Sequence, residues 1–134
     1  MFIGVYWLSE RDLLSRVAQE VAFNHHKQLA SDFTSDSYLH LAGVMDKLDF
    51  ELKAPVFPDS VDYQLLGARY CSIQGNIAAQ LTLRDAQGRI LTLYITQVNE
   101  RLAELHNQQQ LHADLLIRNW REGALFFSLA SPQG

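Results

Sequence analysis

Apolar residues recur at helical spacing in the first third of the chain. Ser9 precedes an acidic turn, and the apolar stripe that follows predicts a helix over residues 10 to 29. A second start signal, Ser35-Asp36-Ser37, precedes a stripe that runs to Leu48 and predicts a shorter second helix. Both predicted helices lie before residue 50.

The pattern changes to alternation after a stretch that contains Pro55 and Pro58. Because proline has no backbone N–H, residues 50–62 are predicted to cross the domain as an extended segment. Alternation and turn residues then predict a meander of three antiparallel strands. Gly88 suits the positive φ of the second turn, and Gly67 within the first strand predicts a bulge or a close backbone approach. The predicted strands cover residues 63–72, 77–84 and 90–98.

The last part of the chain predicts a closing hairpin from residues 111–120 and 124–130, with a turn at Arg121-Glu122-Gly123. Residues 99–110, rich in Gln, fit either a short helix or a long exposed loop. Helices followed by strands exclude a βαβ array. We therefore expect an α+β fold in which two N-terminal helices pack on one face of a roughly five-stranded antiparallel sheet.

Length supports a single domain over residues 1–134, with a helical part at about 10–48 and a sheet part at about 62–130. The net charge of −4 and only 11 scattered Lys and Arg residues argue against nucleic-acid binding. One cysteine cannot form an intrachain disulfide. The apolar start has no preceding basic residue, and no window reaches membrane-spanning length. We expect a cytoplasmic protein without direct membrane insertion.

Histidines and the cysteine are the candidates for a sensor site. His25 and His26 lie near the end of the first predicted helix, where either a packed role or metal binding is possible. His40, His106 and His112 are scattered without any metal-binding spacing. Metal or redox sensing through Cys71 and the His25, His26 pair is therefore the alternative function, and no cofactor is expected.

Cys71 lies on a predicted strand, two residues after Arg69 and therefore on the same face. A nearby cation would lower its pKa and make it reactive, whereas a strand cysteine beside Tyr70 is commonly a small core residue. Arg69, Tyr70, Cys71 and Tyr94 are the candidate ligand or sensor residues. No pair of a nucleophile and a base can be named from the sequence, so an enzymatic function is the least favoured hypothesis.

Trp120, Phe126 and Phe127 gather at the closing hairpin. Adjacent residues of a strand face opposite sides of the sheet, so one Phe points away from the face that carries the helices. Either a helix or loop covers it, or these aromatic residues form an exposed patch for a protein partner or a homodimer.

The order of several short motifs is similar to one bacterial family. They are Asn24-His25-His26, Lys53-Ala54-Pro55, Leu65-Leu66-Gly67-Ala68-Arg69, Ala78-Ala79-Gln80-Leu81, Leu91-Thr92-Leu93-Tyr94 and the stretch from Trp120 to Phe127. In this order, from about Arg16 to Leu129, the chain resembles the C-terminal sensor domain of membrane-anchored anti-sigma factors.

That family also carries an N-terminal sigma-binding helical segment and a transmembrane helix, and neither has a counterpart here. The resemblance therefore implies a free-standing sensor domain that is an accessory to a sigma factor or a stress response. The sequence as a whole predicts a non-enzymatic regulatory module that binds a protein partner, through the outer face of the sheet or the last hairpin.

Overall fold

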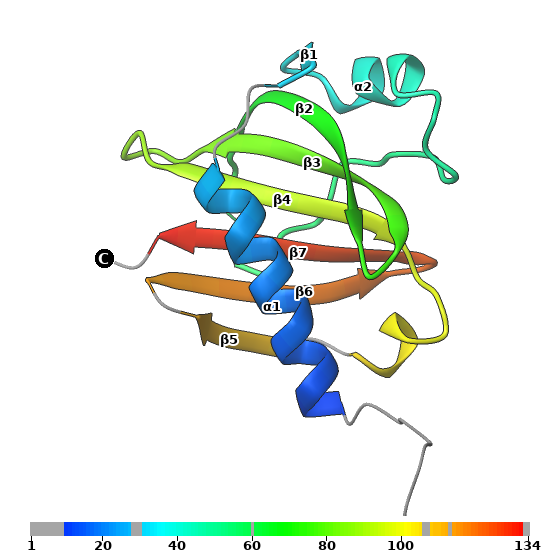
Figure 1. The fold of residues 1–134 in the computed structure, drawn as a ribbon. Helices are drawn as coiled ribbons and strands as arrows, with labels where there is room; N and C mark the ends of the chain where they lie inside the picture. Colours follow the sequence, from blue (N-terminus) through cyan, green and yellow to red (C-terminus); the bar gives the residue numbers. More distant parts are fainter. Residues whose placement is uncertain (1–9, 28–30, 60, 106–107, 113, 133–134) are drawn as a thin grey trace, which may run out of the picture.

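The computed structural model describes residues 10–27, 31–59, 61–105, 108–112 and 114–132. Its centre is a seven-stranded sheet with every neighbouring pair antiparallel, in the order β1-β2-β3-β4-β7-β6-β5 (Figure 1). The strands are β1 (Phe33–Thr34), β2 (Gln64–Ile73), β3 (Asn76–Arg84), β4 (Ile90–Gln97), β5 (Gln108–His112), β6 (Leu115–Glu122) and β7 (Leu125–Pro132).

The two α-helices of the described chain cover opposite faces of this sheet, and a 3-10 helix, η1 (Leu102–Glu104), forms within the stretch predicted as a short helix or a loop. Helix α1 (Glu10–Lys27) crosses one face diagonally, and α2 (Tyr38–Val44) lies over the other (Figure 1). The Ser37 hydroxyl caps α2 by accepting the backbone N–H of His40. The expected α+β class is confirmed, but the helices do not share one face, because both faces of the sheet are apolar enough to require a cover.

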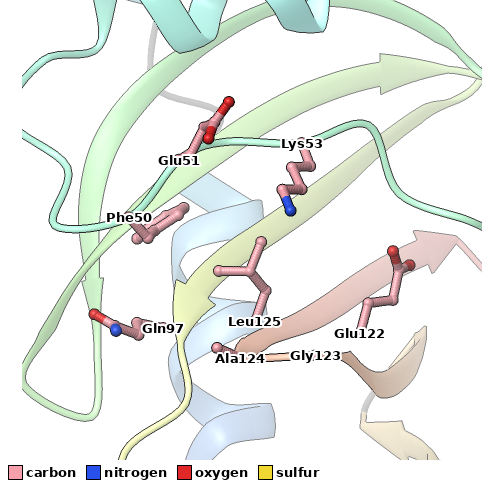
Figure 2. Close-up of a pocket in the computed structure, with 8 residues that line it drawn as sticks. All are labelled: Phe50, Glu51, Lys53, Gln97, Glu122, Gly123, Ala124 and Leu125. Carbon is pink, nitrogen blue, oxygen red and sulfur yellow. The ribbon is translucent and has the colours of Figure 1, made fainter.

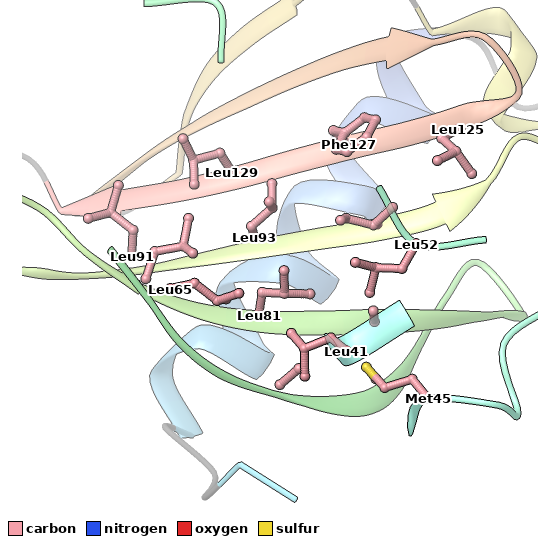
Figure 3. Close-up of a cluster of buried hydrophobic side chains, with 14 of the residues drawn as sticks. Leu41, Met45, Leu52, Leu65, Leu81, Leu91, Leu93, Leu125, Phe127 and Leu129 are labelled. Atoms are coloured by element: carbon pink, nitrogen blue, oxygen red, sulfur yellow. The ribbon is translucent and has the colours of Figure 1, made fainter. Parts of the chain in front are cut away.

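A leucine-rich core fills the α2 side of the sheet. It joins α2 to alternate residues of five strands and to Leu52, and Figure 3 shows these side chains converging. Alternation places Leu81 and Leu93 in this core, whereas Tyr94 belongs to a second cluster beneath α1. The α1 side contains the smaller residues Ala18, Ala22, Ala78 and Ala130. The two layers are therefore separate cores divided by the sheet.

The sheet has two more strands than the five expected. β1 is only two residues long, which is too short to show any period, and it pairs with β2 at Gly67. β5 lies within the Gln-rich stretch interpreted as a helix or a loop and in the start of the predicted strand 111–120. Its burial pattern alternates only between half-buried and exposed positions, so an apolar alternation could not reveal it.

Gly67 is confirmed as the site of a bulge and of a close backbone approach. The β2–β3 register shifts between Leu65 and Gly67, and a Cβ atom on Gly67 would lie 2.7 Å from the carbonyl oxygen of Phe33. A side chain at this position would therefore push β1 away from β2. Gly88 has the positive φ expected of it, at 82°.

Residues 50–59, called the strap below, run in an extended conformation over the α2 side of the sheet. The strap buries Leu52 in the leucine-rich core, as expected for a proline-containing crossing segment. None of the helices within the described ranges is long and apolar enough to cross a membrane.

Candidate functional site

The four candidate sensor residues do not all lie together. The register aligns Arg69 with Gln80 and Gln80 with Tyr94, which places Arg69 and Tyr94 on the α1 face. Cys71 lies on that face too, because it packs against the cluster beneath α1. Tyr70 points to the opposite face, where its ring meets Phe33 edge-on at 5.7 Å between centroids. A single polar pocket formed by all four residues is therefore excluded by the geometry.

The Cys71 thiol lies in surroundings that keep it protonated. Burial raises the pKa of Cys71 to about 12, the positive charge of Arg69 opposes this shift, and the negative charge of Glu20 adds to it. Because the thiolate is the reactive form, the folded protein has little nucleophilic cysteine at neutral pH. The cation expected to activate Cys71 is present but does not outweigh burial.

His25 is a packed histidine. Its ring is buried, and Nδ1 lies 2.7 Å from the Thr92 hydroxyl oxygen on β4. The side chain of His26 lies outside the described part of the structure. The strand pairing aligns Cys71 with Ala78 and Ala78 with Thr96 of β4. His25 contacts Thr92, four residues further along β4, so His25 and Cys71 lie over different parts of the sheet. Among the described residues, no three His, Cys, Asp or Glu side chains gather closely enough to hold a metal ion.

The aromatic residues of the closing hairpin are buried. Trp120 and Phe127 stack on the α2 side, with ring centroids 5.3 Å apart and an interplanar angle of 7°. Phe126 faces the α1 side, as alternation requires, and α1 covers it. Of the two expectations, the structure favours covered aromatic residues, because Trp120, Phe126 and Phe127 are at most 4% exposed. They cannot themselves form an open patch in this conformation.

A pocket of about 380 Å³ opens between the strap, the end of β4 and the turn that joins β6 to β7 (Figure 2). Phe50 and Leu125 supply its apolar surface, while charged groups come from Glu51, Lys53 and Glu122. Its volume lies within the range of sites that bind small molecules or single side chains. Its described lining therefore combines an apolar surface with two carboxylates and one amine.

The pocket is shaped by hydrogen bonds that hold the strap to β6. The Glu122 Oε2 atom accepts two of them, from the backbone N–H of Val56 at 2.8 Å and from the indole N–H of Trp120 at 2.9 Å. The turn itself is fixed because Val98 N–H donates to the Ala124 carbonyl at 2.7 Å. Both walls of the pocket are therefore anchored before any ligand arrives.

A second polar contact fastens the far end of the strap. The Asp59 carboxylate accepts from the Arg118 guanidinium at 2.8 Å and from the Tyr63 hydroxyl at 2.7 Å. Partial burial alone would raise the pKa of Asp59, but these hydrogen bonds and the charge of Arg118 outweigh it and hold the pKa below its ordinary value. The Asp59 carboxylate is therefore ionised at neutral pH in the folded protein.

The sequence did not single out the pocket residues. Phe50, Glu51 and Lys53 lie in an irregular segment with no periodic pattern, and Glu122 was interpreted as part of a turn. The one available signal was the pair of prolines, which predicted a crossing segment but not what it crosses. The strap meets the turn only through the tertiary fold.

No family model, no curated protein and no solved structure was found to match the chain.

Proposed function

We propose that the chain is a non-enzymatic regulatory module that binds a protein partner at the pocket between the strap and the β6–β7 turn. The observation that carries this proposal is the mixed lining of that pocket, with apolar Phe50 and Leu125 beneath an exposed rim of Glu51 and Lys53. Protein interfaces combine an apolar centre with a polar rim in the same way.

The neighbouring surface supports a protein partner over a small molecule. Val56 on the strap is 75% exposed, next to the backbone N–H that binds Glu122. Residues 51–57 of the strap belong to no helix, strand or turn, and the backbone N–H of Val56 binds a side chain and not a neighbouring strand. An extended partner segment can therefore place an apolar side chain in the pocket and pair with strap backbone groups.

The resemblance to anti-sigma sensor domains suggests the class of partner. We propose that it belongs to a sigma-factor or stress-response pathway, and that two acidic groups, Glu51 and Glu122, favour a partner segment with a basic residue beside the apolar one. This surface differs from the exposed hairpin aromatics that the sequence suggested.

Calorimetric titration with the purified sigma factor encoded nearest to the gene tests this proposal. We expect binding by the wild-type chain, and a loss of about tenfold or more in affinity for Glu51→Lys, because a rim charge is reversed. Asp46→Lys is the matched control, since Asp46 is an exposed acid outside the pocket lining. Equal affinities for both variants would remove the pocket as the binding site, and no binding would remove the sigma-pathway link.

A further inference from the structure

A row of polar side chains crosses the sheet beneath α1. The register places Asn119 beside Ser128, Ser128 beside Tyr94, and Tyr94 beside Gln80. All four side chains are at most 5% exposed. Against this face α1 packs apolar and mostly small residues: Leu13, Val17, Ala18, Val21 and Ala22. The helix therefore covers the row without offering side-chain hydrogen-bond partners along its buried face.

Two members of the row are buried without a hydrogen-bond partner among the described residues. Within this part of the chain neither amide atom of Asn119 has a partner, and the hydroxyl oxygen of Ser128 has none. A buried polar group without a partner has lost its hydrogen bonds to water and gained none from the protein, so its burial beneath α1 is unfavourable. Water reaches Asn119 and Ser128 when α1 leaves, so their hydration favours an open state. Such groups call for an explanation in a native protein.

Three residues of α1 make polar contacts that the described part of the structure shows. Glu20 accepts from the backbone N–H and the side-chain amide of Gln74, each at 3.0 Å. His25 meets Thr92, and the Tyr94 hydroxyl donates to the Val21 carbonyl at a long 3.4 Å. The strands, by contrast, are joined to one another by continuous ladders. Loss of α1 contacts therefore breaks no ladder of the sheet.

We propose that α1 is a displaceable cover, which leaves the sheet as a unit while the strands and the leucine-rich core on the α2 side stay folded. Opening exposes a sheet face whose centre is the row Asn119, Ser128, Tyr94 and Gln80. Local units of a fold open with free energies below that of global unfolding, and here the orphaned groups of the row lower that free energy. This inference does not rest on the proposed partner pocket, which lies on the opposite face.

Cys71 provides a built-in reporter of the opening. It is the single cysteine of the chain, and it packs against the cluster beneath α1. Cys71 is partly buried and burial raises its pKa to about 12, so the thiol should react slowly with a disulfide reagent such as 5,5′-dithiobis(2-nitrobenzoic acid) while α1 is in place and faster after α1 leaves. The rate of labelling then measures how often α1 opens.

The experiment compares the labelling rate of the full chain in low urea with global unfolding followed by circular dichroism. We expect labelling to depend on urea less steeply than global unfolding does, because the departure of α1 exposes the cluster beneath it but leaves the leucine-rich core on the α2 side buried. The double variant Asn119→Leu, Ser128→Ala should slow labelling about tenfold, since it removes the orphaned groups. Thr92→Val, which removes the hydroxyl that His25 Nδ1 meets, should speed labelling about tenfold, and Arg16→Ala, at an exposed position of α1, should leave it unchanged.

Three results would overturn the proposal. Labelling with the full urea dependence of global unfolding means that α1 does not open separately. Labelling at one rate in every variant means that the thiol reacts in the closed state. Faster labelling of the double variant means that Asn119 and Ser128 hold α1 in place, through bridging water. If the double variant does not fold, Ser128→Ala alone gives the same comparison with a smaller change.

Discussion

The two faces of the sheet are covered in different ways. On the α2 side, α2 and the strap cover a leucine-rich core. The hydrogen bonds that hold the strap to β6, from Val56 to Glu122 and from Arg118 to Asp59, lie at the solvent-exposed edge of this core. On the α1 side one helix lies over a surface that includes every buried polar or charged residue of the described chain: His25, Gln80, Thr92, Thr96, Asn119 and Ser128.

This difference predicts that the two sides of the sheet contribute unequally to the free energy of unfolding. Apolar burial contributes in proportion to area and needs no directional match, so the α2 side can hold the fold together. Buried polar atoms stabilise only when each finds a partner. Among the described residues, Asn119 and Ser128 lack one on the α1 side and the Tyr38 Oη and Arg118 Nε atoms lack one on the α2 side, where more apolar residues pack together. The α2 side is therefore expected to carry most of the free energy of unfolding, and the α1 side to open first.

Two neighbouring phenylalanines offer the largest test of this contrast. Phe127 stacks on Trp120 in the leucine-rich core, and Phe126 lies beneath α1. Phe→Ala changes in cores cost about 3–5 kcal/mol, and less where the site can collapse. We expect Phe127→Ala near the upper end and Phe126→Ala near the lower end, measured by urea unfolding. A larger loss from Phe126→Ala would reverse the ranking of the two faces.

Periodicity predicted the helices and the three-strand meander because their residues have partners close in sequence. Helix α1 repeats its apolar positions over five turns, and β2, β3 and β4 are joined by short turns. What failed was the placement of the helices on one face, since β4 is buried on both sides from Leu91 to Thr96. A strand that is buried on both sides does not reveal which helix covers which face.

The candidate site was harder to predict than the fold for a physical reason. Lys53 and Glu122 approach one pocket only because the strap crosses β6, and nothing local in either segment encodes that crossing. Arg69 and Tyr94 lie on the α1 face, whereas strand alternation places Tyr70 on the other face. A one-residue step along a strand decides the face, and a site spans both sides only at a turn or an edge.

Thr92→Val tests the short polar contact between His25 of α1 and the sheet. The substitution keeps the shape of the side chain and removes the hydroxyl that His25 Nδ1 meets at 2.7 Å. Loss of a buried partner costs about 1–3 kcal/mol, so urea unfolding should show a drop of that size. Thr82→Val on β3 is the control, because Thr82 is only half-buried, and its change should stay within about 0.5 kcal/mol. Equal effects would mean that the His25 contact contributes nothing.

Trp120→Phe tests how the strap is held on the other face. The indole N–H donates to Glu122 Oε2, which also accepts from Val56. Phenylalanine keeps an aromatic ring against Phe127 but cannot donate, so we expect a loss of about 1–2 kcal/mol in thermal or urea unfolding. The labelling rate of Cys71 should not change, because α1 lies on the opposite side. Faster labelling would show that the two covers are coupled through the sheet.

The smallest effect concerns the charge that fastens the strap. Asp59 has a pKa below its ordinary value when folded, so its contribution is present above the unfolded pKa of about 3.9 and is lost as the pH falls through the folded value. Because the carboxylate is partly exposed, the contribution should be below about 1 kcal/mol. Asp59→Asn should therefore be slightly less stable than the wild type at pH 7, and this deficit should shrink as the pH falls through the folded pKa of Asp59, while Asp62→Asn, an exposed neighbour, should show no difference across the same range. A deficit of Asp59→Asn that does not shrink in acid would show that packing, not charge, holds this end of the strap. The contrast between the faces would then be one of apolar area alone.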